Sequence, residues 1–165
     1  MSSDNTATAR EILRRNITAV NNRDMNAYLA NQHPDVEFVL PGGTTLRGRE
    51  QVRASTQAFW DAFPDGRLEF GAQVLAEDSA ATEVIFSGTH TGPIPTPNGE
   101  LPATGRTIQT TSISMLTFAD GMVISEHVYS DQLELLTQLG LAASPGPSTG
   151  KGHRQAQEAR RPGDG

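Results

Sequence analysis

The first part of the chain carries apolar residues at the period of an α-helix. Residues 6–22 form one apolar stripe, which consists of Ala9, Ile12, Leu13, Ile17 and Val20. Residues 49–63 form a second stripe, and a Pro-Asp-Gly turn follows it. Between the two stripes, Asp24 can cap a short helix over residues 25–31, and residues 35–40 alternate as a strand. The pattern therefore predicts three helices and one strand in this part.

From residue 67 the apolar period changes to two, which is typical of strands. The alternating segments are residues 67–76, 81–90, 106–118 and 122–129. The first of them is predicted to place four side chains on one face: Leu68, Phe70, Ala72 and Val74. Residues 93–105 contain four prolines and two glycines and predict a long loop. Residues 131–139 predict a last helix, with Gly140 at its C′ position.

This order of elements indicates the class of fold. Helices come first, then a run of antiparallel strands, then one short helix, which is typical of an α+β domain. In such a domain the helices cover one face of a bent sheet. The space between the helices and the sheet is then a candidate binding pocket.

Composition narrows the class of protein. The chain has 165 residues, of which 36% are hydrophobic and 19% charged, and this suits one domain plus a tail. We expect a domain over residues 1–141 and a disordered tail rich in Gly, Pro and Ser over residues 142–165. The net charge of −6 argues against nucleic acid or a membrane as a partner. With no signal segment or membrane span visible, a cytoplasmic protein is expected.

Metal and disulfide chemistry have little support in the sequence. The chain has no cysteine. Its four histidines, His33, His90, His127 and His153, show no spacing of four residues that would place two ligands on one helix face. We therefore predict no metal site.

Strand alternation selects Glu126 as the main candidate for acid–base chemistry. In residues 122–129 it is the ionisable side chain in phase with Met122, Ile124 and Val128, whereas Val123 falls with His127 on the opposite face. A carboxyl on an apolar wall has a raised pKa and can serve as general acid or base near neutral pH. The alternative is a carboxylate at a sheet edge, in water or paired with an arginine.

The preceding strand carries a short row of hydroxyl groups. Thr110, Ser112 and Ser114 are in phase with the apolar Ile108 and Leu116. A polar patch within an apolar surface suits hydrogen bonding to a ligand better than it suits a dry core. We therefore interpret the three residues as candidates for substrate binding.

His90 and Asp131 are further candidates for catalysis. His90 is in phase with Phe86 and ends its strand just before the proline-rich loop, which would place it at a pocket mouth. A histidine bonded to a backbone carbonyl is the alternative. Asp131 precedes the last helix, with Glu134 three residues later, so it can act as a helix cap without any catalytic role.

Tyr28, Trp60 and Arg106 are candidates for substrate binding. Tyr28 and Trp60 lie on the inward stripes of their helices, where plain core packing is the alternative. Arg106 follows the proline-rich loop. It could anchor an acidic or carbonyl-bearing ligand, or it could be a solvated charge.

Four segments together resemble a known family. They are HPDVEFVLPGG, GREQVRASTQAFWDAFPD, GTHTGPIPTPNGELPATGR and FADGMVISEHVYSDQLELLTQLG. In this order they resemble the polyketide cyclase SnoaL-like family, of the ester cyclase type, within the nuclear transport factor 2-like superfamily. The resemblance covers about residues 8–141. It implies a cone-shaped α+β fold, with N-terminal helices packed on a strongly bent antiparallel or mixed sheet and a short C-terminal helix.

The resemblance also implies an activity. Characterised cyclases of this family close an aromatic ring by intramolecular aldol condensation, without metal or organic cofactor and often as homodimers through the sheet. Their acid/base aspartate corresponds to Val128, and their pocket histidine and glutamine to Ser114 and Ser112. Valine cannot transfer a proton. Glu126 could substitute from the same face, as could Asp131 if the strand bulges.

Three functions follow as hypotheses. The first is a cofactor-independent cyclase or isomerase that transfers protons on a small hydrophobic carbonyl compound. The second is a non-catalytic small-molecule-binding or accessory dimerisation module of the same fold. The third is an enzyme similar to epoxide hydrolases, which needs an arginine between two carboxylates on one face.

Overall fold

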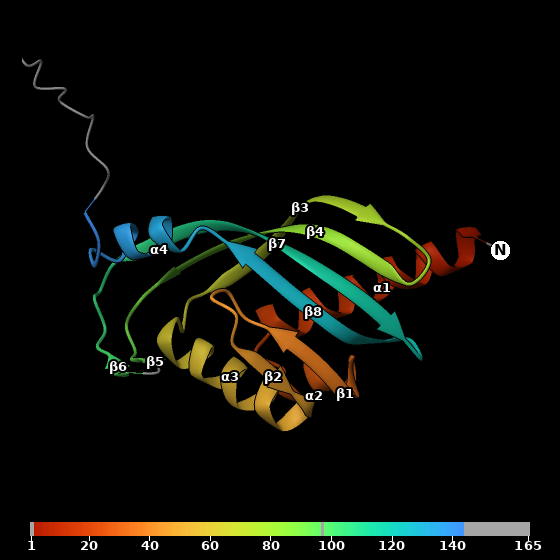
Figure 1. Cartoon of the computed structure of the whole chain (residues 1–165), viewed down its shortest axis with the longest axis horizontal. Coiled ribbons are helices and arrows are strands. Elements are labelled where there is room, and N and C mark those ends of the chain that lie inside the picture. The colour runs from red at the N-terminus through yellow and green to blue at the C-terminus, as the bar shows by residue number, and fades with distance from the viewer. Residues whose placement is uncertain (1, 97, 144–165) are drawn as a thin grey trace, which may run out of the picture.

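The computed structural model describes residues 2–96 and 98–143, and Figure 1 shows their arrangement. The helices are α1 (Ser2–Asn21), α2 (Met25–Ala30), α3 (Gly48–Ala62) and α4 (Gln132–Gln138). The strands are β1 (Gln32–Val39), β2 (Thr45–Arg47), β3 (Arg67–Leu75), β4 (Ser79–Thr89), β5 (Ile94–Thr96), β6 (Gly99–Leu101), β7 (Thr107–Ala119) and β8 (Met122–Ser130). This confirms the α+β class. The predicted tail lies outside the described residues from residue 144 onward.

Six strands form one curled, mixed sheet in the order β2-β1-β8-β7-β4-β3. Neighbouring strands are antiparallel except β1 and β8, which run parallel and place Phe38 beside Glu126. On the other side of β8, Glu126 faces Leu116 of β7. Helices α1, α2 and α3 cover one face of the sheet, and α4 lies beside the first residues of β7 (Figure 1). Glu126 is therefore held in the middle of the sheet.

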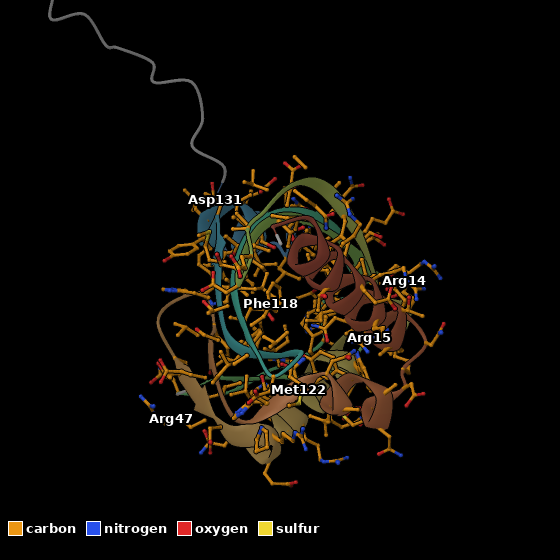
Figure 2. The ribbon with its side chains drawn as sticks, turned by 90° about the vertical axis from the view of Figure 1, so that its right-hand side faces the viewer. Arg14, Arg15, Arg47, Phe118, Met122 and Asp131 are labelled. Atoms are coloured by element: carbon orange, nitrogen blue, oxygen red, sulfur yellow. The ribbon has the colours of Figure 1, made fainter. Side chains whose placement is uncertain are left out.

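Apolar residues from the helices and the sheet form three packed clusters. The first contains Ile12, Leu13, Ala80, Leu116 and Val123, the second Ala19, Tyr28, Leu29, Val36 and Val52, and the third Ala62, Phe63, Phe86, Ile108 and Leu139. Phe118 packs against the first cluster and lies inside the molecule, whereas Arg14 and Arg15 point outward from α1 (Figure 2). The stripe predicted for residues 6–22 thus faces the sheet. None of the described helices has the length and hydropathy needed to cross a membrane.

Two β-bulges correct the predicted alternation. In β3 the register shifts between Phe70 and Gln73, so Val74 is 72% exposed and does not share the inner face of Leu68. In β8 the extra residue is Ile124, and Val123 is consequently fully buried in the core instead of on the outer face. One extra residue reverses the side on which every residue beyond it lies.

Three short strands were not predicted. Strand β2 pairs with β1 and leads into α3. Strands β5 and β6 form a hairpin within the proline-rich segment that was predicted as a loop, and they pair only with each other. Prolines are tolerated there because both strands are edge strands. The hairpin contributes Ile94 and Pro95 to the cavity described below.

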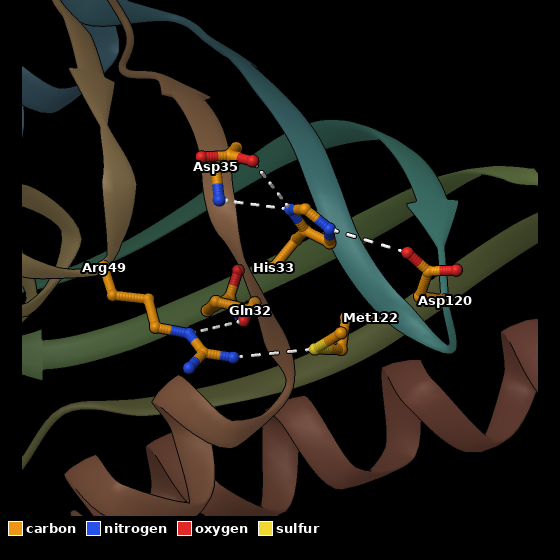
Figure 3. A network of polar contacts seen from close by, with 6 residues as sticks. All are labelled: Gln32, His33, Asp35, Arg49, Asp120 and Met122. Atoms are coloured by element: carbon orange, nitrogen blue, oxygen red, sulfur yellow. Dashed lines mark hydrogen bonds and ion pairs between the residues drawn. The ribbon is translucent and has the colours of Figure 1, made fainter.

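A polar network fastens β1 to α3 and to the turn between β7 and β8 (Figure 3). Arg49 Nε donates to the Gln32 carbonyl at 2.7 Å, and Arg49 Nη2 lies 3.6 Å from Met122 Sδ. His33 Nε2 is 3.7 Å from Asp120 Oδ2, and its Nδ1 accepts from the backbone N–H of Asp35. These contacts join β1 to α3, to Met122 of β8 and to the turn before it, next to the parallel β1–β8 pairing that positions Glu126.

Candidate functional site

A cavity of about 830 Å³ lies between the inner face of the sheet and helices α1, α2 and α3. Its lining is largely apolar, and the aromatic members are Tyr28, Phe38, Phe59, Trp60, Phe63, Phe70 and Phe86. Among the described lining residues, Glu126 is the only acidic or basic side chain. The size and the apolar walls are those of a small-molecule site.

Glu126 lies inside this cavity, on the face that alternation predicted. Its Oε1 accepts a hydrogen bond of 2.8 Å from Ser114 Oγ on β7. Burial raises the pKa of Glu126 to about 7, and the Ser114 hydrogen bond opposes this shift because it favours the charged form. Neither alternative considered from the sequence applies, since the carboxylate is not at a solvated edge and has no arginine partner in the described chain.

The two oxygens of the Glu126 carboxylate differ. Oε1 is bonded to Ser114, whereas Oε2 has no hydrogen-bond partner among the residues described. Oε2 is also absent from the fully buried polar atoms without a partner, so it is open to the cavity. An oriented carboxylate with one free oxygen is the arrangement that a general base requires.

Tyr28 faces the same end of the cavity from α2. Burial and the negative charge of Glu126 raise the pKa of the Tyr28 hydroxyl. The phenol is therefore neutral at physiological pH and can donate a hydrogen bond. A neutral donor near a carboxylate can stabilise an oxygen that becomes negative during a reaction.

The predicted row of hydroxyls on β7 lines the cavity. Thr110, Ser112 and Ser114 all contribute to it. Ser114 donates its hydrogen bond to Glu126. Ser112 Oγ makes a long contact of 3.4 Å with the Val84 carbonyl. Thr110 and Ser112 are therefore available to a ligand, as the sequence interpretation proposed.

His90 is fully buried but does not line the cavity. Its ring lies 5.3 Å from the ring of Phe63, and its Nδ1 accepts from the backbone N–H of Thr104 at 3.2 Å. Burial lowers the pKa of His90, so the ring is neutral. His90 therefore holds in place the segment that carries the β5–β6 hairpin. Its own side chain lies outside the cavity that contains Glu126.

Asp131 and Arg106 also lie outside the cavity lining. Asp131 is the N-cap of α4 and accepts from the backbone N–H of Glu134 at 3.0 Å. Arg106 is exposed, and its guanidinium lies against Gly140 at the end of α4. Gly140 has φ 76°, which fits the predicted C′ position. The structure therefore does not bring Asp131 or Arg106 together with Glu126.

Replacing Asp131 by alanine should lower the free energy of unfolding by about 0.5–2 kcal/mol, because the first turn of α4 loses its cap. Asp131→Asn and Asp131→Ser keep an acceptor and should restore most of that stability. Urea unfolding followed by circular dichroism measures the three values. Activity lost in Asp131→Asn at full stability would return Asp131 to the catalytic candidates.

Trp60 lines the cavity from α3, and its indole Nε1 is buried without a hydrogen-bond partner in the described structure. The guanidinium carbon of Arg23 lies 5.4 Å from the Trp60 ring centroid. Sequence reasoning did not single out Thr56, Thr82 or Ser130, which add hydroxyls to the lining. Ser130 could have been predicted as a lining residue, because it lies at the next alternate position after Glu126 and Val128.

In the described ranges, no three His, Asp or Glu side chains are grouped closely enough to hold an ion. The absence of a metal from the active protein stays a prediction.

The sequence matches the SnoaL-like polyketide cyclase family over residues 10–139. No curated protein matches it. Among solved structures, TsrD from Streptomyces laurentii is 26% identical with a TM-score of 0.72, over 82% of this chain and 97% of TsrD. IdmH from Streptomyces antibioticus, proposed to be a polyketide cyclase, is 28% identical with a TM-score of 0.66, over 79% of this chain and 97% of IdmH.

A third structure shares the fold at lower identity. It is a hypothetical protein with a ketosteroid isomerase-like fold from Catenulispora acidiphila DSM 44928, solved in complex with trimethylamine. It is 20% identical with a TM-score of 0.66, over 80% of this chain and 94% of that protein. These likenesses confirm the predicted fold.

Proposed function

The chain belongs to the SnoaL-like polyketide cyclase family, and from this we propose that it transfers protons on a hydrophobic carbonyl compound bound in the cavity, without a cofactor. The observation that carries the proposal is one carboxyl with a pKa of about 7 at the wall of an otherwise uncharged cavity. A group with this pKa is partly ionised at neutral pH, so it can both accept and return a proton.

In the proposed reaction, Glu126 Oε2 accepts a proton from the carbon next to the carbonyl group. The electron pair of that C–H bond forms the enolate, whose oxygen accepts hydrogen bonds from Tyr28 or from the free hydroxyls on β7. The enolate carbon then attacks a second carbonyl of the same molecule, or takes a proton back at another position. Protonated Glu126 supplies the proton that completes either outcome.

Exchange of carbon-bound hydrogen tests the proposal without knowledge of the substrate. The protein is incubated in D₂O with 1-tetralone, a bicyclic aromatic ketone, and the α-proton signal is followed by NMR. Loss of that signal faster than in buffer is the expected result. A rate equal to that of Glu126→Gln protein would count against proton transfer by Glu126.

The non-catalytic binding module stays the second candidate. It is favoured by Val128, which lines the cavity at the position that corresponds to the family's acid/base aspartate. Binding of the hydrophobic ketone to the protein, with no α-proton exchange above the rate in buffer, would support the binding module. The epoxide-hydrolase hypothesis is weaker, because the described lining holds neither an arginine nor a second carboxylate.

We keep the homodimer as part of the proposal. Ile113, Met115 and Tyr129 lie on the outer face of β7 and β8 and are 41%, 48% and 53% exposed. Tyr129 stacks on His127, with ring centroids 4.1 Å apart. An exposed apolar group of this kind on the outer sheet face suits contact with a second copy.

Ser114 is expected to set the pH range of the reaction. Its hydrogen bond stabilises ionised Glu126, so Ser114→Ala should raise the pKa of Glu126 above its value of about 7. A hydrogen bond to a charged group is worth about 1.5–3 kcal/mol, so the rising limb of the pH–rate profile should move up by about one pH unit or more.

The exchange rate between pH 5 and 9 measures this shift. Ser114→Thr keeps the hydroxyl and should keep the profile, and Ser112→Ala is the matched control without a bond to Glu126. An unchanged profile in Ser114→Ala would show that the bond does not tune the base.

A further inference from the structure

Glu126 is a half-buried carboxylate without a counter-charge among the described residues. The lining residues within the described structure include no lysine, arginine or histidine. Its one side-chain hydrogen bond within the described structure comes from the neutral hydroxyl of Ser114. Buried carboxylates are normally paired with a cation, and an unpaired one attracts any cation that can reach it.

The walls around this carboxylate are suited to a cation with an apolar body. Phe38 is the strand neighbour of Glu126 on β1, and Tyr28 faces it from α2. Ammonium groups are attracted to aromatic faces. Farther along, Phe59, Phe63 and Phe86 form a group of rings with centroids 4.9–5.4 Å apart.

The two parts of the cavity lie at different positions along β7. Glu126 faces Leu116, and Phe86 faces Thr110, six residues earlier. At about 3.4 Å per residue, the strand length between them is about 20 Å. A ligand with its charge at Glu126 can therefore extend an apolar chain toward the aromatic group.

We propose that the cavity binds hydrophobic amines as ammonium ions, with the nitrogen at Glu126 Oε2 and the apolar body along the aromatic walls. This binding goes beyond the proposed reaction, because it requires only an accessible carboxylate and no proton removal from carbon. It also implies that carboxylate-bearing ligands are rejected, since their charge would repel that of Glu126.

The binding should depend on pH in one direction. Amines stay protonated to about pH 10, so the ionisation of Glu126, with its pKa of about 7, controls the affinity. From the elements packed around it, Tyr28 of α2 is the titratable side chain that faces Glu126, and it stays neutral in this range. The other lining residues on α1, α3, β1 and β7 are uncharged. Affinity should be constant above pH 8 and fall about tenfold per unit well below pH 7.

Trp60 provides the measurement, because it is the only tryptophan of the chain and it lines the cavity. Its fluorescence is titrated at pH 8 with n-octylamine, n-octanol and octanoate, which share one apolar chain. Octylammonium should bind about 10- to 100-fold more tightly than octanol, as expected for a charged hydrogen bond, and octanoate should bind least.

Variants separate this site from non-specific binding. Glu126→Gln should lose the preference for octylammonium and keep its affinity for octanol, which also shows that it is folded. Glu69→Gln removes an exposed glutamate of β3 and should behave as wild type. Equal affinity for amine and alcohol, or an amine affinity unchanged in Glu126→Gln, would overturn the proposal.

A second measurement tests the amine site if the variant fails, and one outcome separates this site from the proposed reaction. If Glu126→Gln does not fold, the pH dependence of octylamine binding to the wild-type protein decides, and a flat profile from pH 5 to 9 contradicts the proposal. Amine binding with no ketone exchange would reject the proposed reaction and leave the amine site in place.

Discussion

Replacing Glu126 by glutamine should slow α-proton exchange by about 10²- to 10⁴-fold, the usual contribution of a general base. Glutamine keeps the shape of the side chain and can still accept the Ser114 hydrogen bond, but its amide cannot take up a proton at neutral pH. The protein should remain folded, because the substitution removes a desolvated carboxyl and no apolar contact.

The control for this experiment is Glu69→Gln, which removes an equal charge from the exposed side of β3. Its exchange rate should equal that of the wild type. Normal turnover in Glu126→Gln would remove Glu126 from the mechanism, and the binding module would become the leading interpretation.

Replacing Phe63 by alanine should lower the free energy of unfolding by about 3–5 kcal/mol, as for other buried aromatic side chains. Phe63 is 3% exposed, and its ring meets those of Phe59, Phe86 and His90. Its loss leaves a void where the end of α3 meets β4 and the buried His90.

Phe59 is the matched control, because it lies on α3 one turn before Phe63, the C-cap residue of that helix, and belongs to the same group of rings but is 37% exposed. Phe59→Ala should cost clearly less than Phe63→Ala in urea unfolding. Equal losses would mean that the ring contacts, and not the burial of Phe63, determine the stability of this end of the cavity.

The inward position of Glu126 could be predicted from strand alternation, although of the in-phase residues Met122, Ile124 and Val128 only Val128 is among the described cavity-lining residues, because the bulge at Ile124 shifts the register. Strand alternation fixes the side of the sheet on which a residue lies, and the neighbours of Glu126 on that side are apolar. The same argument placed Thr110, Ser112 and Ser114 correctly. Alternation is a local property of the chain, so it is readable without knowledge of the fold.

Alternation failed at Val74 and Val123, where a bulge adds one residue to a strand. The first bulge contains Gly71, and a glycine inside a strand often marks a bulge, but the pattern of the sequence does not fix the register shift. The second bulge, at Ile124, has no such mark. The bond from the backbone N–H of Ala72 to Glu83 Oε2 stabilises the first one and is a contact between two strands. Such contacts depend on the tertiary structure.

His90 shows a different limit. Its phase within β4 predicted an inward side chain, and it is buried. The sequence could not show that the segment after it folds back, so that Thr104 bonds to the ring and Phe63 covers it. Burial and access to the cavity are separate properties, and only the first follows from periodicity.

The parallel pairing of β1 with β8 determines when the domain can be completed during synthesis. In β1 and β8, Gln32 pairs with Val123 and Phe38 with Glu126, so about 90 residues separate the paired positions. Contacts between distant segments slow folding, because the chain between them loses freedom before the contact forms. A ribosome-bound chain that ends before β8 leaves one side of β1 and one side of β7 unpaired, and it lacks Glu126 altogether. Such a chain exposes two strand edges to other chains until the last strand leaves the exit tunnel, which makes this interval the one in which a chaperone would be needed.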